Sequence, residues 1–146
     1  MSEILKIFLT SSLTIIGGVT VYALSQIVVG PIFEQRKIIG EIADALIFYA
    51  NVYSSRIPGL TSKGKIDEAS KRLRQLAALL QSKTHLIPWY GVFERLRIVH
   101  KSAAIEDASA ALIGLSNSVG DSSPQSSEHV RGYVNKIKER LNLRIT

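Results

Sequence analysis

The chain of 146 residues contains no cysteine. Disulfide bonds, thiol catalysis and thiolate metal sites are therefore excluded, although this absence does not identify a cellular compartment. Histidine is scarce, and His85, His100 and His129 lack the spacing of a helical metal site. Glycine-rich phosphate loops and nucleophile elbows are missing as well. The sequence therefore predicts a protein that is not an enzyme, with no catalytic residues, metal site or cofactor.

Charge is absent from one long segment. The 27 residues from Ile7 to Phe33 include no Asp, Glu, Lys or Arg. A helix needs about 20 apolar residues to cross a hydrocarbon core about 30 Å thick, so this run is long enough to span a membrane with some tilt. We therefore expect residues 1–33 to form an N-terminal segment with a transmembrane anchor at about 7–33.

A cleavable signal peptide is the alternative interpretation of this run. Residues 21–23 (Val-Tyr-Ala) resemble a small-residue cleavage site, and Lys6 provides a short positive region before the apolar residues. However, Glu3 weakens that positive region, and the apolar run continues past the cleavage site to Phe33. An uncleaved signal-anchor is therefore favoured.

Small residues lie along one face of the expected span. Thr10, Thr14 and Gly18 recur every fourth residue, and small residues at this spacing let two membrane helices approach closely. They are candidates for self-association of the span and hence for a homo-oligomer. The alternative is that a span simply tolerates these residues, since Ser and Thr hydroxyls can bond to the helix backbone.

Positive charge predicts the orientation of the chain. Of its 18 Lys and Arg residues, all except Lys6 follow the span, and Arg36 and Lys37 lie directly at its carboxyl end. Positive flanks of a span tend to stay in the cytoplasm. We therefore expect a single-pass protein whose C-terminal domain is cytoplasmic.

Apolar residues keep a helical spacing through the rest of the chain, and no segment alternates like a β-strand. The sequence predicts an all-α protein with a small helical bundle at 34–119, a linker at 120–127 and a basic amphipathic helix at 128–146. Within the bundle we expect helices at about 65–85, 89–98 and 102–119, a loop at 56–64, and a kink at Gly30–Pro31 where the first helix leaves the membrane.

Aromatic and basic residues gather in the short segment 89–98. Its candidate lipid or partner contacts are Trp89, Tyr90, Phe93, Arg95 and Arg97. Aromatic rings rest in the headgroup layer of a membrane, where arginines meet phosphates, so this segment suits a membrane surface. The alternative is that the aromatic rings cap the core of the domain.

The final helix carries a second candidate surface, formed by Arg131, Lys136, Lys138 and Arg140. In a chain with a net charge of +6, this face suits an anionic lipid leaflet, a nucleic acid or a protein partner. No nucleic-acid-binding motif accompanies it. The alternative is a solvated basic face on a helix that packs against the domain.

Three segments, Leu112–Ser118, Tyr49–Tyr53 and Arg74–Ala77, resemble those of small uncharacterised bacterial membrane proteins with one N-terminal span. The similarity covers about residues 24–119. It implies a protein of the bacterial cytoplasmic (inner) membrane, and it implies no activity, cofactor or partner.

Together these patterns predict a membrane-anchored, non-enzymatic helical interaction module. Its expected partners are the lipid bilayer and either another protein or a second copy of the chain. Two alternatives are open: a small oligomerising effector that acts on the membrane, and a membrane-tethered binder of nucleic acid or anionic lipid.

Overall fold

The computed structural model describes residues 3–54, 62–119, 121 and 123–145, and within them the chain is helical without any strand. The elements are α1 (Glu3–Leu24), the π-helical turn η1 (Ser25–Val29), α2 (Gly30–Phe48), α3 (Ala50–Ser54), α4 (Lys63–His85), α5 (Tyr90–Arg95), α6 (Ser102–Ser118) and α7 (Pro124–Arg140). The predicted all-α class is confirmed. Positions 56–61 of the loop expected at 56–64 lie outside the described residues. Positions 120 and 122 of the expected linker also lie outside them.

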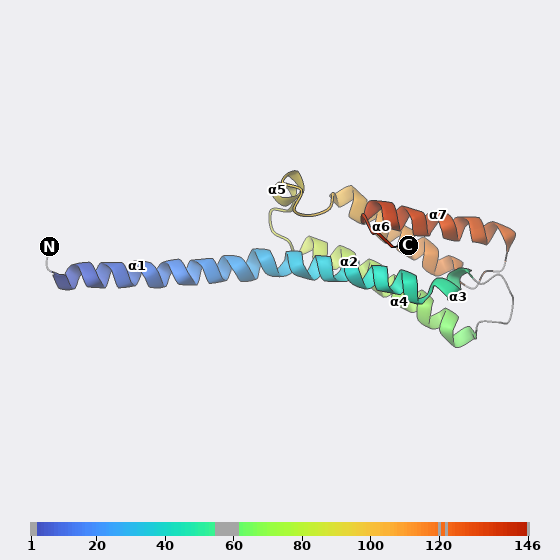
Figure 1. Ribbon diagram of the computed structural model, residues 1–146, viewed down its shortest axis with the longest axis horizontal. Helices are drawn as coiled ribbons and strands as arrows, with labels where there is room; N and C mark the ends of the chain where they lie inside the picture. The colour runs from blue at the N-terminus through green and yellow to red at the C-terminus, as the bar shows by residue number, and fades with distance from the viewer. Residues whose placement is uncertain (1–2, 55–61, 120, 122, 146) are drawn as a thin grey trace.

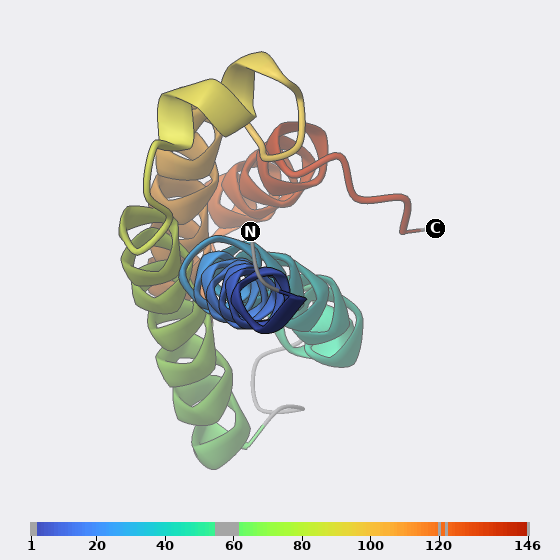
Figure 2. The same ribbon diagram turned by 90° about the vertical axis from the view of Figure 1, so that its left-hand side faces the viewer.

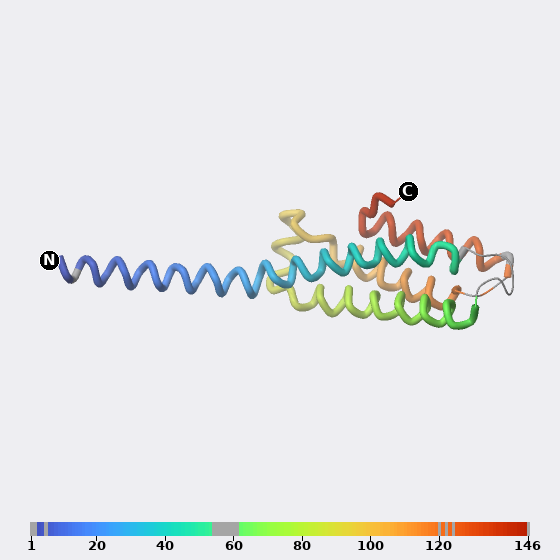
Figure 3. The backbone as a smooth tube through the Cα atoms, turned by 60° about the horizontal axis from the view of Figure 1, so that its bottom comes forward, coloured from blue at the N-terminus to red at the C-terminus, as the bar shows by residue number. Residues whose placement is uncertain are grey.

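The first three elements form one long helix. Figures 1 and 3 show α1, η1 and α2 as a continuous rod, of which α1 projects away from the other helices and α2 lies among them. The part of the chain with the long uncharged run is thus directly joined to the part that packs into the bundle, with no loop between them.

The kink expected at Gly30–Pro31 is not observed, because the helix accommodates the proline in another way. Proline has no N–H to donate, and its ring crowds the carbonyl four residues earlier. The turn before Pro31 is widened to π-helical geometry, in which the Gly30 N–H donates to the Ser25 carbonyl. The rod passes through this region without a sharp bend (Figures 1 and 3).

The bundle consists of α2, α4, α6 and α7, each antiparallel to the next. α2 packs on α4, α4 on α6, and α6 on α7. Viewed along the rod from its N-terminal end, α4, α6 and α7 curve around one side of α2 (Figure 2). Side chains that are at most 2% exposed fill the core: Ile42 and Leu46 of α2, Leu73, Leu76 and Leu80 of α4, Ile105, Leu112 and Leu115 of α6, and Ile137 and Leu141 near the C-terminus.

Close packing of α6 against α7 depends on Gly114. A Cβ atom at this position would lie 2.5 Å from the Cε1 and Cζ atoms of Tyr133, a contact that is far too short. Glycine therefore lets the aromatic ring of α7 lie directly on the backbone of α6.

The C-terminal helix begins earlier than the sequence predicted. Its expected start was Glu128 after a linker, whereas α7 begins at Pro124. The Ser123 hydroxyl accepts a hydrogen bond from the Ser126 N–H at 3.2 Å and so caps the helix. Proline in the first turn is compatible with this start, because the N–H groups there have no partner within the helix.

The same helix is an integral part of the bundle. Val130 and Ile137, together with Leu141 just after the helix, are buried in the core that α2, α4 and α6 share. The prediction of a basic helix separate from domain 34–119 is corrected accordingly, because the apolar stripe of α7 is needed to close that core.

Replacing Leu112 by alanine should strongly destabilise the bundle. This side chain is fully buried, so its loss leaves a cavity and should lower the free energy of unfolding by about 2–5 kcal/mol. The matched control is Ile113→Ala, because Ile113 is the next residue of α6 and is 44% exposed; its effect should be within about 0.5 kcal/mol. Urea unfolding of the full chain in detergent micelles, followed by circular dichroism, measures both. Equal destabilisation would contradict the burial pattern of α6.

Candidate functional site

The helix from Lys6 to Phe48 is long and apolar enough to cross a membrane, and 0% of its most apolar window is buried. Large apolar side chains of α1 are exposed on all its sides: Ile4, Ile7, Phe8, Leu9, Leu13, Ile15, Ile16, Val19, Val21 and Tyr22. A helix that is apolar all round normally lies within a large core or a membrane. The bundle of this chain does not bury this surface.

The candidate self-association face lies on this exposed helix. The Thr10 hydroxyl donates to the Lys6 carbonyl and the Thr14 hydroxyl to the Thr10 carbonyl, both at 2.9 Å. At Gly18 an added Cβ atom would meet nothing within 4 Å. The hydroxyls are therefore satisfied within the helix, and self-association through this face stays a prediction.

The aromatic segment is positioned at the end of the bundle from which α1 emerges (Figures 1 and 2). A small apolar cluster of Ile32, Ile87 and Val99 holds it there, and Phe93 and Tyr90 pack against this cluster. The Arg36 Nη2 group reinforces the contact by donating to the Ile98 carbonyl at 2.9 Å. The segment is thus fastened to the rod at the start of α2.

The residues of this segment divide into two groups. Tyr90 and Phe93 are half-buried and cover the small apolar cluster, as the core-capping alternative expects. In contrast, Trp89 is 67% exposed, and Arg95 and Arg97 are exposed as well. The exposed group is free to meet a membrane or a partner.

A buried polar network lies behind the aromatic segment. The Gln35 side chain is 1% exposed, and its Nε2 donates to the Thr84 hydroxyl at 2.8 Å and to the Tyr90 hydroxyl at 3.2 Å. The Tyr90 hydroxyl donates in turn to the His100 carbonyl at 2.6 Å. The His100 Nε2 lies 3.1 Å from the Leu141 carbonyl. The network therefore connects α2, α4, α5 and the end of α7.

Burial raises the pKa of Tyr49, Tyr53 and Tyr90 above the usual value of 10.0. For Tyr49, the hydrogen bond donated to Glu68 and the charge of that carboxylate raise the pKa further. For Tyr90, the hydrogen bond accepted from Gln35 lowers the pKa in part, because it favours the phenolate.

An apolar groove separates the rod from the aromatic segment. It has a volume of about 250 Å³ and is lined by Val28, Val29, Ile32, Phe33, Arg36, Phe93 and Ile98. Its walls thus come from the end of the uncharged run and from the α5 region, with one guanidinium group among them. A groove of this composition suits an apolar chain that carries an anionic end.

The basic residues of α7 are only partly available. Lys136 and Arg140 both bind the Asp107 carboxylate of α6, at 3.2 and 3.0 Å. The Lys138 Nζ donates to the Ile145 carbonyl at 3.1 Å, whereas Arg131 is exposed. Because one carboxylate neutralises part of this face, no observation favours nucleic-acid binding over the packed-helix alternative, and nucleic acid as a partner stays a prediction.

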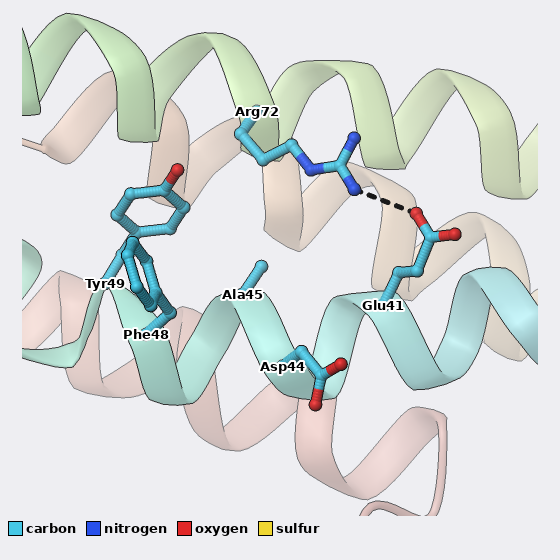
Figure 4. Close-up of a pocket in the computed structure, with 6 residues that line it drawn as sticks. All are labelled: Glu41, Asp44, Ala45, Phe48, Tyr49 and Arg72. Carbon is cyan, nitrogen blue, oxygen red and sulfur yellow. Dashed lines mark hydrogen bonds and ion pairs between the residues drawn. The ribbon is translucent and has the colours of Figure 1, made fainter.

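A second hollow lies between α2 and α4, in the half of the bundle away from α1. Its volume is about 230 Å³, and Figure 4 shows the lining residues Glu41, Asp44, Ala45, Phe48, Tyr49 and Arg72. Arg72 binds Glu41 at 2.8 Å, while the Asp44 carboxylate points away from this pair. Phe48 is 76% exposed and contacts Tyr49 edge to face at 5.0 Å between ring centroids.

Sequence reasoning missed two features of these sites. Gln35 lies one helical turn before Ile39, so it was a polar residue on the core face, a pattern that points to a buried hydrogen bond. Ile47 and Phe48 fall outside the apolar stripe that contains Leu46, and two large apolar residues off the core face point to a contact surface.

Comparisons with known proteins add no identification: no protein family, no curated protein and no solved structure matches this chain. The resemblance to small bacterial membrane proteins therefore stays a prediction.

Replacing Gln35 by leucine should raise the pKa of Tyr90 further. The variant loses the hydrogen bond that favours the phenolate, whereas the desolvation that raises the pKa remains. The folded state holds the Tyr90 proton more tightly than the unfolded chain does. The contribution of this proton to the free energy of unfolding is therefore complete below pH 10.0 and is lost as the pH rises above that value.

Spectrophotometric titration of tyrosinate, with Tyr90→Phe to assign the signal, measures this shift. The matched control is Gln81→Leu, because Gln81 is an exposed glutamine of α4. An unchanged Tyr90 titration in the Gln35 variant would contradict the network.

Proposed function

We propose that the chain is a membrane-anchored, non-enzymatic helical interaction module. The observation that carries this proposal is the contrast within the rod: α1 exposes apolar side chains on every side, whereas α2 buries one face in the bundle. α1 crosses the bilayer, and the bundle is held rigidly at its surface because no loop interrupts the rod.

Retention of the anchor is supported by the apolar residues beyond the alternative cleavage site. Ile27, Val29 and Phe33 follow Ala23 and are 58%, 43% and 65% exposed. Removal of residues 1–23 would leave these side chains in water at the end of the bundle, which is unfavourable. Arg36 and Lys37 are exposed just after them, and positive charge at this end supports a cytoplasmic bundle.

The surface around Phe48 is the proposed contact for a partner protein. Ile47 and Phe48 are 56% and 76% exposed, and Asp44 provides an exposed carboxylate beside the hollow. Exposed apolar side chains next to a carboxylate suit a partner that presents apolar and basic side chains. The surface lies in the half of the bundle away from α1, where a soluble partner can approach (Figure 1).

Charges placed within α1 should prevent membrane anchoring. Each arginine at the centre of a span costs about 2.5–3.5 kcal/mol, so Ile15→Arg with Ile16→Arg should release the chain on carbonate extraction. The matched control is Ile47→Arg with Ile113→Arg, which places the same charges on the bundle surface and should leave the chain in the membrane.

The intact mass of the membrane-bound chain and a reporter fused to its C-terminus complete this test. We expect an uncleaved chain with the reporter in the cytoplasm. Loss of the first 23 residues, or wild-type chain in the carbonate supernatant, would refute the anchor.

A photo-crosslinking amino acid at position 48 should capture the partner in native membranes. The control places it at position 113, because Ile113 is also exposed but lies on α6 away from the hollow. We expect a crosslinked species from position 48 alone, whose mass distinguishes a second copy of the chain from another protein. Asp44→Lys should weaken this crosslink. Crosslinks from both positions or from neither would count against the proposed surface.

A further inference from the structure

We propose that α5 and the residues next to it form a second membrane contact, which docks on the headgroups of an anionic phospholipid surface. Trp89, Val92 and Leu96 enter the headgroup layer, and Arg95 and Arg97 bind lipid phosphates. This inference rests on the proposed membrane anchor and adds the part of the bundle that the bilayer touches.

The depth of α5 along the rod supports this contact. As a helix, the uncharged run of 27 residues is about 40 Å long, roughly 10 Å more than the hydrocarbon core. The end of the run, around Val28 to Phe33, therefore lies at the headgroup level when Ile7 is at the opposite boundary. Phe93 packs against the cluster that contains Ile32, with Val28 beside it, which places α5 at this same level.

The outer side of α5 has the composition of a membrane-surface element. Trp89, Val92 and Leu96 are spaced three and four residues apart and are 67%, 56% and 61% exposed. They surround a shallow hollow that Arg95 also lines. Tryptophan is enriched at membrane surfaces, where its ring is partly in apolar surroundings and its N–H meets water or headgroups.

The exposed charge next to α5 matches an anionic surface, because the one carboxylate of α5, Glu94, is half-buried and accepts a hydrogen bond from the Ser102 N–H at 3.2 Å. Within the described residues, neither Arg95 nor Arg97 forms an ion pair. Arg36 reaches the same region through its bond to the Ile98 carbonyl, and the exposed Lys101 follows directly. Basic residues held close to a membrane are attracted to its anionic lipids.

The groove beside α5 is continuous with the surface of the proposed anchor, and this favours lipid over protein as the molecule that contacts α5. The apolar groove beside α5 shares Val29 and Phe33 with the exposed surface of the rod. The medium that surrounds these two residues therefore also reaches Phe93 and Ile98 on the α5 side. When α1 is in the bilayer, that medium is phospholipid.

The single tryptophan of the chain, Trp89, allows a direct test. The full chain is reconstituted into vesicles of phosphatidylglycerol and phosphatidylcholine whose acyl chains carry bromine at different depths. We expect a blue-shifted emission and quenching that is strongest for the bromines nearest the headgroups. The control variant is Trp89→Phe with Phe48→Trp, which moves the tryptophan to an exposed position in the half of the bundle away from α1 and should not be quenched.

Flotation of the same vesicles separates failure of this inference from failure of the anchor. Protein that does not float with the vesicles would refute the anchor itself. Protein that floats but shows no more quenching at Trp89 than at position 48 would refute only the α5 contact. A crosslink from position 89 to another protein in native membranes would refute the same contact.

The two arginines provide a second variant that leaves the fold intact, because both are exposed. Arg95→Gln with Arg97→Gln should weaken docking on anionic vesicles about fivefold for each arginine, and the quenching should fall accordingly. In vesicles of phosphatidylcholine alone, variant and wild type should be quenched equally. Equal quenching in the anionic vesicles would refute the role of the arginines.

Discussion

One unbroken helix carries two surfaces that need different surroundings, and the rest of the structure depends on how it joins them. In α1 the apolar side chains point outward on every side, whereas α2 buries one apolar face and leaves Phe33, Ile47 and Phe48 exposed beside it. The bundle has to cover only that face, and α4, α6 and α7 do so by packing in succession. Because no loop separates the two halves, the surroundings of α1 also determine where the bundle lies.

The two ends of the bundle consequently have different chemistry. At the end next to α1, the buried amide of Gln35 joins α4 and α5 to the rod, and the exposed side of α5 combines apolar side chains with arginines. Around Phe48, by contrast, carboxylates border an exposed aromatic ring. A buried amide with both of its acceptors in place makes the first end rigid, so its exposed residues are held in a constant arrangement.

Much of this fold was predictable from the sequence, because it depends on periodicity and length. The stripes that predicted α4 and α6 contain Leu76 and Leu112, which are indeed buried, and the uncharged run is helical throughout. What the sequence did not reveal depends on contacts between distant residues. Asp107 binds two basic residues of α7, and the sequence around those residues does not indicate this pairing. Likewise, the exposed and buried sides of α5 became distinguishable only once its place against Ile32 was known.

The π-helical turn η1 has a geometric consequence for any assembly of this chain. Each residue of an α-helix turns the chain about 100° around the axis, and a π-helical turn takes in one residue more, so η1 sets the angle between the faces of α1 and α2. Rotation of α1 about its own axis therefore also rotates the bundle, because the two are parts of one continuous helix. Two copies packed through the Thr10 and Gly18 face would hold their bundles at one mutual angle. Insertion of a single residue between Ser25 and Gln26 would turn each bundle by about 100° relative to α1, while Val28 kept its contact with the cluster of Ile32, Ile87 and Val99.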